Sequence, residues 1–489
     1  MLDFSNLAFN NVINVDVGDR INDLQFLERE LKKWLNSKER KLMIEGEKYY
    51  DYEHFILQKR RLVIGEEGKY FEDVNLPNNK FIDNQYATMV DQKVNYLLSK
   101  PLTFRTENKA YSDALNTIFD KGFHKALKNL GKDAYNGGIG WLYPYYNEQG
   151  EFKIRKFKPY EILPFWKNDD HDELDFAVRY YEMLGYMGES EHIYKFVEVY
   201  DTNGIHRFNF ENGALRPDFQ TSYFEQSDND GNVISYNWDR VPLIAFKANN
   251  NETPLLKRCK SLQDGINQLL SEFGDGMNEN ANGSSILVIK NYDGTNLGEF
   301  RRNLAQYKAV KVRSQDGADG GVSTLSIDVN CNNFLTILSE LRKALITNCR
   351  GYDINELKSS GSPNEMTIKS VYSQIDLDAN EIETEFQASF EQLLWFVNQA
   401  IHIDDDVEIV FDRDLMVNES QVIADVNASS ALISKRTALS MHPYVTDVEK
   451  ELKELDKEQE KAMAQFGNAQ VVNDTGVSFE DDKKEDKEE

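Results

Sequence analysis

The stretch CKSLQDGINQLLSEFGDGM, residues 259–277, decides how the rest of this sequence is interpreted. Side chains three and four positions apart lie on one face of an α-helix, and apolar or thiol side chains recur here at that spacing. They are Cys259, Leu262, Ile266, Leu269, Leu270, Phe273 and Met277. The near-heptad repeat predicts a helix that packs along one side. Gly274-Asp275-Gly276 is interpreted as the turn that ends this helix rather than as a phosphate-binding loop.

Beyond this helix the pattern changes. Residues 284–328 indicate strand SSILVIKN, short helix NLGEFRRNLAQY, strand AVKVRS, glycine-rich turn DGADGG and strand VSTLSIDV. A helical pattern then resumes and places Cys331, Phe334, Leu338, Leu341, Leu345 and Cys349 on one face. The sequence therefore predicts a small α/β module inserted between two helices.

The longest predicted element follows a loop rich in glycine and serine, GYDINELKSSGSPNEM, residues 351–366. From Ile368 to Ile401 apolar side chains step by three or four without a break, which predicts a helix of about 50 Å. We expect a strand in DDVEIVFDRD, residues 405–414, and two polar helices near 419–433 and 445–464. The acidic stretch FEDDKKEDKEE is predicted to be disordered.

Upstream, three helical patterns precede a strand-rich region. The patterns cover residues 21–35, 82–97 and 110–127. From Trp141 to about Phe246, large apolar and polar residues alternate between turn signals, which predicts a meander of antiparallel strands. The predicted fold class is α+β, and 489 residues exceed one ordinary core, so we expect two to four packing units.

Composition narrows the possible functions. The chain has 56 basic and 83 acidic side chains, and the net charge of −27 argues against a protein that clamps nucleic acid by neutralising phosphates. No apolar run reaches the ~18 residues of a membrane span. We also expect no secretory signal, because no basic segment precedes an apolar one near residue 1. Three scattered cysteines indicate neither a disulfide framework nor a metal site, as is typical of a cytosolic protein.

Motifs for catalysis are missing from the sequence. It lacks GxxxxGK[ST], HExxH, GxSxG and a GxGxxG after a strand. The acidic run 169–173, around His171, has no EF-hand spacing and is expected to be a solvated loop. A second acidic set leaves a metal-dependent nuclease or phosphodiesterase open as the alternative function: Asp404, Asp405, Asp406, Asp412 and Asp414. We expect no enzymatic activity, no cofactor and no bound metal.

Short motifs occur in a fixed order from about Tyr49 to Glu460. They are Leu76-Pro77-Asn78-Asn79-Lys80, Val90-Asp91-Gln92-Lys93, Tyr96-Leu97-Leu98-Ser99-Lys100-Pro101, Ala134-Tyr135-Asn136-Gly137, Gly140-Trp141-Leu142, Pro159-Tyr160-Glu161-Ile162-Leu163-Pro164, Tyr292-Asp293-Gly294, Leu297-Gly298-Glu299-Phe300-Arg301, Phe411-Asp412-Arg413-Asp414, Thr437-Ala438-Leu439 and Pro443-Tyr444-Val445. Each motif is weak alone. In this order and spacing, the chain resembles the portal proteins of tailed bacteriophages, in the branch found in phages of low-GC Gram-positive hosts.

The resemblance implies a multi-domain portal fold that assembles as a ring. Its parts would be a wing (1–255), a stem helix (256–281), an α/β clip (282–330), a second stem helix (331–350), a tunnel loop (351–367), a long helix and strand returning to the wing (368–417), a crown (418–465) and a disordered acidic tail (466–489).

The resemblance also implies a function without catalysis. About twelve copies would form the channel for DNA packaging and ejection at one capsid vertex, after assembly in the host cytoplasm. The implied partners are the terminase large subunit, head-completion (adaptor) proteins, major capsid and scaffolding proteins, and double-stranded DNA passing without sequence specificity, with no membrane involved.

Two sets of site residues follow from the resemblance. The tunnel loop would present Lys358, Ser359, Ser360, Gly361, Asn364 and Lys369 to DNA. Lys358 and Lys369 either contact phosphates transiently or pair with Glu356 or Glu365. The clip would present Glu299, Arg301, Arg302, Lys308 and Lys311 to the terminase and adaptor proteins.

Overall fold

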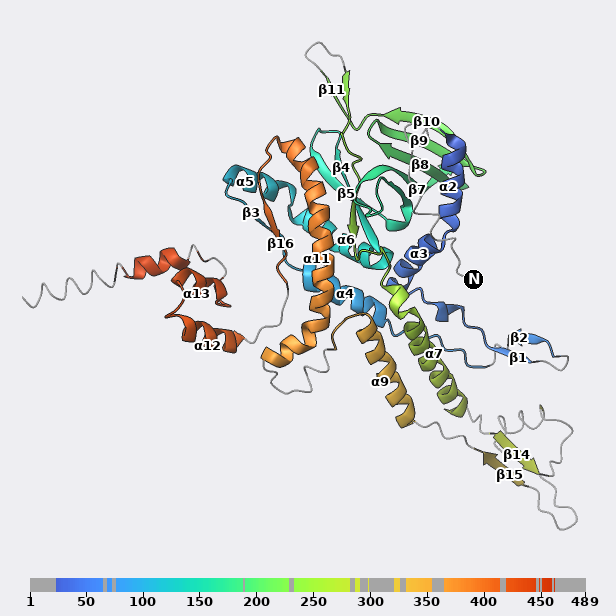
Figure 1. Cartoon of the computed structure of the whole chain (residues 1–489). Coiled ribbons are helices and arrows are strands. Elements are labelled where there is room, and N and C mark those ends of the chain that lie inside the picture. Colours follow the sequence, from blue (N-terminus) through green and yellow to red (C-terminus); the bar gives the residue numbers. More distant parts are fainter. Residues whose placement is uncertain are drawn as a thin grey trace, which may run out of the picture. The chain divides into compact units, whose positions relative to one another are not determined.

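The computed structural model describes residues 23–64, 68–72, 76–187, 190–227, 233–281, 286–290, 298, 321–325, 331–353, 365–413, 419–445, 448, 451–459 and 461 (Figure 1). The chain divides into two compact units. The first comprises Met1–Ile354 with Tyr372–Asp414, and the second comprises Asn355–Val371 with Leu415–Glu489. Helices and antiparallel sheets are both present, in agreement with the predicted α+β class.

Two capped helices begin the described part of the chain. Helix α2 (Leu24–Asn36) is capped by Asp23, whose carboxylate accepts the backbone N–H groups of Gln25 and Phe26 at 3.0 and 3.1 Å. Ser37 ends α2 and caps α3 (Lys38–Tyr50). The buried face of α2 packs on the five-stranded sheet described below, and the predicted amphipathic helix is confirmed from residue 24 onward.

The predicted single helix over 110–127 is wrong, because the structure has two helices there. Helix α4 (Gln85–Leu98) is followed by α5 (Lys109–Ile118) and α6 (Lys121–Gly137). The break lies at Phe119-Asp120. The Asp120 carboxylate accepts the backbone N–H of Phe123 at 2.8 Å and so starts α6 afresh. The Phe119 ring packs between Phe104 and Phe123, with centroids 4.9 and 4.7 Å away.

The strand-rich region consists of antiparallel strands, as predicted, and the structure divides them into two sheets and a separate hairpin. The strands are β4 (Ile139–Tyr146), β5 (Phe152–Phe157), β6 (Ile162–Trp166), β7 (Leu174–Met187), β8 (Ser190–Asp201), β9 (Gly204–Glu211), β10 (Ala214–Thr221), β11 (Phe224–Ser227), β12 (Val233–Tyr236) and β13 (Ile244–Lys247). The five-stranded sheet is a meander in the order β10-β9-β8-β7-β6, and the three-stranded sheet has the order β13-β4-β5. Strands β11 and β12 form the hairpin.

Two helices and a hairpin follow the strand-rich region. Helix α7 (Leu256–Ala281) leads to β14 (Ile286–Lys290), which pairs antiparallel with β15 (Gly321–Leu325) before α9 (Cys331–Asn348). Gly274-Asp275-Gly276 lies inside α7, so its interpretation as a terminal turn is wrong. The predicted helix 296–307 and strand 309–314 lie outside the described residues, except for helical Gly298.

The longest element is α11 (Glu365–Ile401), as the apolar repeat predicts. It begins at Glu365, so the last three residues of the predicted loop 351–367 belong to the helix. The following strand, β16 (Glu408–Val410), is shorter than predicted and pairs with β3 (Thr103–Arg105).

Outside these elements, β1 (Leu62–Ile64) and β2 (Tyr70–Glu72) form a small hairpin. In the second unit, α12 (Glu419–Ser429) lies within the helix predicted over 419–433, and α13 (Lys435–Met441) is a further helix that was not predicted. Residues 451–459, within the helix predicted over 445–464, are helical. Among the described helices, none is both long and apolar enough to cross a membrane.

Candidate functional site: the junction around α4

A row of polar side chains runs along the buried side of α7. Gln263, Asn267, Ser271 and Asp275 follow one another every four residues, and each residue is at most 1 % exposed. Side chains four apart stack on one face of a helix. They face an extended segment, residues 79–83, that leads into α4. We call these four side chains the polar ladder.

The polar ladder binds backbone amides of the extended segment in reverse order. The N–H of Asn79 donates to Asp275 at 2.7 Å, that of Phe81 to Ser271 at 2.9 Å, and that of Asp83 to Asn267 at 3.0 Å. The N–H of Tyr86 donates to Gln263 at 2.9 Å. Two residues of extended chain rise about 6.7 Å and four residues of helix about 6.0 Å, so alternate amides meet successive side chains. The helix therefore takes the place of a neighbouring strand.

Basic side chains stabilise the buried carboxylate at the Asp275 end of the polar ladder. The Asp275 carboxylate also accepts from Lys59 Nζ at 2.7 Å, and Arg61 NH1 lies 3.6 Å away. Burial raises the pKa of Asp275, but the hydrogen bonds from Lys59 and Asn79 outweigh burial and hold the pKa below its ordinary value. The carboxylate is therefore ionised, and it is fixed by these contacts at the point where α7 passes through Gly274-Asp275-Gly276.

His54 supports the middle of the polar ladder. Its Nε2 lies 3.0 Å from the carbonyl of Tyr49, and its Nδ1 lies 2.9 Å from the amide nitrogen of Asn267. An amide NH₂ only donates, so Nδ1 accepts and the ring is neutral. Burial lowers the pKa of His54 and favours this neutral form.

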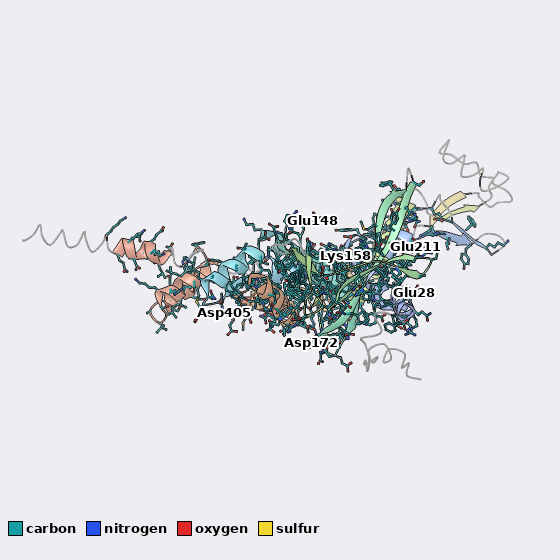
Figure 2. All side chains as sticks on the ribbon, turned by 90° about the horizontal axis from the view of Figure 1, so that it is seen from above. Glu28, Glu148, Lys158, Asp172, Glu211 and Asp405 are labelled. Atoms are coloured by element: carbon teal, nitrogen blue, oxygen red, sulfur yellow. The ribbon has the colours of Figure 1, made fainter. Side chains whose placement is uncertain are left out.

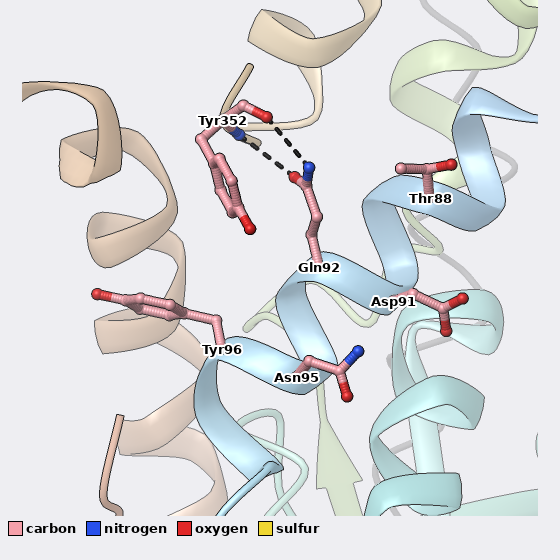
Figure 3. Close-up of a pocket in the computed structure, with 6 residues that line it drawn as sticks. All are labelled: Thr88, Asp91, Gln92, Asn95, Tyr96 and Tyr352. Carbon is pink, nitrogen blue, oxygen red and sulfur yellow. Dashed lines mark hydrogen bonds between the residues drawn. The ribbon is translucent and has the colours of Figure 1, made fainter. Parts of the chain in front are cut away.

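The opposite side of α4 holds the chain that leaves α9. The Gln92 side chain pairs with the backbone of Tyr352: its NH₂ donates to the carbonyl at 3.1 Å, and its oxygen faces the N–H at 3.4 Å (Figure 3). Lys93 Nζ lies 3.4 Å from the carbonyl of Arg350. Gly351 passes so close to Met89 that a Cβ at this position would overlap the sulfur. Residues 350–352 are thus fixed to α4.

A buried ion pair joins α4 to α11. Lys93 Nζ lies 2.6 Å from Asp378, and these side chains are 0 % and 11 % exposed. The Tyr135 hydroxyl from α6 donates to the same carboxylate at 2.9 Å. Burial lowers the pKa of Lys93 against the opposing attraction of Asp378, and burial followed by Asp378 raises the pKa of Tyr135.

Stacked tyrosines connect the residue after Gly351 to α11 and α4. The rings of Tyr352 and Tyr372 stack with centroids 4.6 Å apart, and Tyr96 lies against Tyr372 at 5.9 Å. The Tyr96 hydroxyl donates to Asp376 at 2.9 Å, and burial together with this carboxylate raises the pKa of Tyr96 to about 12. Tyr352, which follows α9, and Tyr372 of α11 are therefore held together beside Tyr96 of α4. We call this set of contacts of Gln92, Lys93 and Tyr96 the α4 junction.

A hollow of about 300 Å³ opens beside these contacts. It is lined by Thr88, Asp91, Gln92, Asn95, Tyr96 and Tyr352 (Figure 3). Cys259 of α7 and Cys349 after α9 are both fully buried free thiols. The neighbouring Cys349 thiol, and then burial, raise the pKa of Cys259, and its S–H donates to the carbonyl of Leu255 at 3.7 Å, so Cys259 acts as a small apolar group of the packed core.

Most site residues expected from the sequence lie outside the described residues. This holds for Lys358, Ser359, Ser360, Gly361 and Asn364, and for Glu299, Arg301, Arg302, Lys308 and Lys311. Lys369 is described and is an exposed residue of α11.

The acidic runs do not converge. Asp404 accepts from Asn398, Asp405 from Asn108, and Asp412 faces Thr103 at 3.3 Å, while Asp414 lies outside the described residues. Asp405 and Asp172 lie on separate parts of the first unit (Figure 2). Among the described residues, no three acidic, His or Cys side chains are placed to share a metal ion.

The run 169–173 is exposed at its acids, as expected for a solvated loop, but His171 is not free. Its Nδ1 lies 2.6 Å from Glu252, and its ring stacks on Trp166 with centroids 5.0 Å apart.

Neither the polar ladder nor the α4 junction was predicted from the sequence. The ladder had a visible signal, since four polar residues repeat every four positions between the apolar ones. Gln92 and Lys93 lie within a motif that supports the family resemblance, but their partners, Tyr352 and Asp378, are more than 250 residues away.

The chain is similar in sequence to known portal proteins. The chain is 28 % identical to the portal protein of Bacillus phage SPP1 over 459 residues, which cover 91 % of this chain and 88 % of that protein. It is 24 % identical to the portal protein of Clostridium phage phiCD119 over 439 residues, covering 87 % of this chain and 94 % of that protein. A solved chain from the neck of a native GTA particle aligns with 73 % of this chain and 89 % of its own length, at 11 % identity and a TM-score of 0.39. Residues 32–465 match the model of the family described as phage portal protein, SPP1 Gp6-like, and the chain therefore belongs to this family of phage portal proteins.

Proposed function

We propose that this chain is the subunit of a ring of about twelve copies at one capsid vertex, the channel through which DNA is packaged and ejected. Family membership over residues 32–465 is the observation that carries the proposal. In this assignment the chain is a structural component of the virion that is assembled in the host cytoplasm, and it catalyses no reaction.

The helix pair α7 and α9 is assigned to the stem of such a ring. The Phe273 and Phe334 rings stack with centroids 3.8 Å apart, and Leu338, Leu345 and the two thiols are buried between the elements. The polar ladder fixes α7 to the segment before α4. A helix pair held this firmly at one end can transmit force between the wing (1–255) and the clip (282–330).

Residues 351–367 are assigned to the channel loop. The stacking of Tyr352, near the start of this loop, on Tyr372, five residues beyond its end, supports a loop that is anchored at its base. Lys358, Ser359, Ser360, Gly361, Asn364 and Lys369 would then face the DNA. A net charge of −27 on each copy disfavours tight binding of the phosphate backbone, which suits a conduit through which DNA has to slide.

The clip residues Glu299, Arg301, Arg302, Lys308 and Lys311 are assigned to contacts with the terminase large subunit during packaging and with head-completion proteins afterwards. Major capsid and scaffolding proteins would surround the ring. These partners follow from the family alone, and alanine variants of the clip residues would test them in a binding assay with purified terminase.

Native mass spectrometry with negative-stain imaging of the full chain tests the proposal. A ring of about twelve 56.5 kDa subunits with a central hole is expected. A stable monomer or dimer at high concentration would contradict it. In a packaging assay, deletion of residues 357–361 should block DNA uptake without preventing ring assembly, because the anchoring contacts at Tyr352 and Tyr372 are unchanged.

A further inference from the structure

One face of α6 carries a stripe of lysines. Lys121, Lys125, Lys128 and Lys132 are spaced four, three and four residues apart within α6 (Figure 1). At 100° per residue they fall within an arc of about 60°, and at 1.5 Å per residue they extend over about 16 Å of the helix. Three buried apolar residues of α6, Phe123, Leu127 and Leu130, lie on the opposite face of the helix. We call these four residues the lysine stripe.

Three of the four charges are unneutralised in the part of the chain that the structure describes. Lys132 lies 2.9 Å from Asp91 and also donates to the Tyr50 hydroxyl. No described acid lies within 4.0 Å of the other three ammonium groups. The two acids nearest to them in the sequence are engaged elsewhere, because Asp120 caps α6 and Asp133 pairs with Lys156. Three free cations in a row stand out on a chain whose net charge is −27.

The composition of this face distinguishes between possible partners. Protein–protein interfaces are depleted in lysine and enriched in aromatic residues, methionine and arginine. Of the large apolar side chains found exposed in the described chain, none belongs to α6. Lysine is a compact point charge on a flexible stem and contacts phosphate without requiring a fixed geometry. A row of lysines without apolar neighbours therefore fits a polyanion better than a protein surface.

We propose that the lysine stripe binds the phosphate backbone of duplex DNA, without sequence specificity and separately from the channel loop. Successive lysines rise by about 6.0, 4.5 and 6.0 Å along α6, and phosphates recur every ~3.4 Å of duplex axis on one DNA strand, so the stripe is long enough to reach several phosphates. Charges more than about 10 Å away are largely screened at moderate salt, so the local stripe rather than the net charge decides binding. The proposal rests on the proposed function only for the presence of DNA.

The test measures binding of a fluorescent 30-base-pair duplex to the full chain between 50 and 200 mM salt. With three phosphate contacts, the affinity should fall roughly 40-fold over this range, and it should be equal for two unrelated DNA sequences. The variant Lys121→Gln/Lys125→Gln/Lys128→Gln should lose most of the binding and nearly all of its salt dependence. Glutamine keeps the helix propensity of lysine, so α6 should stay folded, which circular dichroism checks.

The matched control is Lys38→Gln/Lys257→Gln/Lys435→Gln, which changes the net charge equally at three exposed sites on different elements. It should bind DNA like the unaltered chain. Equal binding by the two triple variants, or no binding by the unaltered chain at 50 mM salt, overturns the proposal. If the α6 variant instead changes only the assembly mass, the stripe contacts another copy and the proposal is also overturned. A ring that does not bind DNA leaves the portal assignment intact, whereas lysine-dependent binding without a ring removes only that assignment.

Discussion

Removing the lysine of the buried ion pair should loosen the exit of α9 from α4. In Lys93→Met the Asp378 carboxylate, 11 % exposed, keeps the hydroxyl of Tyr135 as its one hydrogen-bond partner among the described residues. Breaking a buried pair by removing one partner costs about 3–5 kcal/mol. Since Asp378 retains some access to solvent, we expect the lower end, about 3 kcal/mol. The Lys93 contact with the Arg350 carbonyl is lost as well.

Hydrogen–deuterium exchange measures this loss locally. The amides of Cys349 and Gly351 bond to the carbonyls of Leu345 and Ile346, both at 2.9 Å, and are exposed when the α9 exit opens. A loss of about 3 kcal/mol corresponds to exchange that is faster by roughly 150-fold, because 1.36 kcal/mol is a factor of ten. Amides of β8, in the five-stranded sheet, should be unchanged.

The double variant Lys93→Met/Asp378→Asn is the matched control. Asparagine carries no charge and still accepts from Tyr135, so no uncompensated buried charge remains and exchange should return most of the way to that of the unaltered chain. The reasoning is refuted if Lys93→Met exchanges within threefold of the unaltered chain, or if the double variant exchanges as fast as the single one.

Three further changes test other parts of the first unit. Asp275→Leu removes the acceptor of the Asn79 amide and the partner of Lys59, so exchange at 79–83 should rise by a factor that corresponds to about 2–3 kcal/mol, and an unchanged rate would argue against the polar ladder. The pKa of His54 is lowered in the folded chain, so its contribution to stability is complete above the unfolded pKa of about 6.5 and is lost as pH falls below that value. The thermal unfolding midpoint should therefore drop between about pH 7 and pH 5, and it should drop less in His54→Gln. Gly46→Ala should destabilise the protein by several kcal/mol, because a Cβ would overlap the carbonyl of Asn136. Gly265→Ala, where a Cβ would meet nothing within 4 Å, should instead raise the free energy of unfolding by about 1 kcal/mol. Equal thermal midpoints for the two variants would contradict this packing.

The elements that the sequence predicted well are those whose cause is local. The apolar repeats of α7, α9 and α11 and the alternation in β4 to β13 reflect which side of each element is buried, and this periodicity is present in the residues themselves. The break before α6 also had a local signal, an aspartate in a capping position, but the apolar spacing on either side of Asp120 suggested one continuous helix.

What the sequence could not predict depends on distant partners. Asp275, between two glycines, is typical of a turn until Lys59 and Asn79 supply the contacts that keep it buried in a helix. A lysine such as Lys93 is usually found at the surface, and the ion pair with Asp378 compensates for its burial here. Such pairings are properties of the fold and have no periodic signature.

The polar ladder and the extended segment that it binds have unequal spacings, so a small offset between side chain and amide accumulates along the pair. From Asn79 to Asp83 the extended chain advances about 13.4 Å, while α7 advances about 12 Å from Asp275 to Asn267. From Ser271 onward the side chains grow longer, to asparagine and then glutamine, as this offset accumulates. The match also depends on parity: one inserted residue between 76 and 84 would turn the other set of amides towards α7, whereas two would keep the same set facing the helix and shift it by one step. The length of this segment should therefore drift in pairs over evolution, although the segment itself has no regular secondary structure.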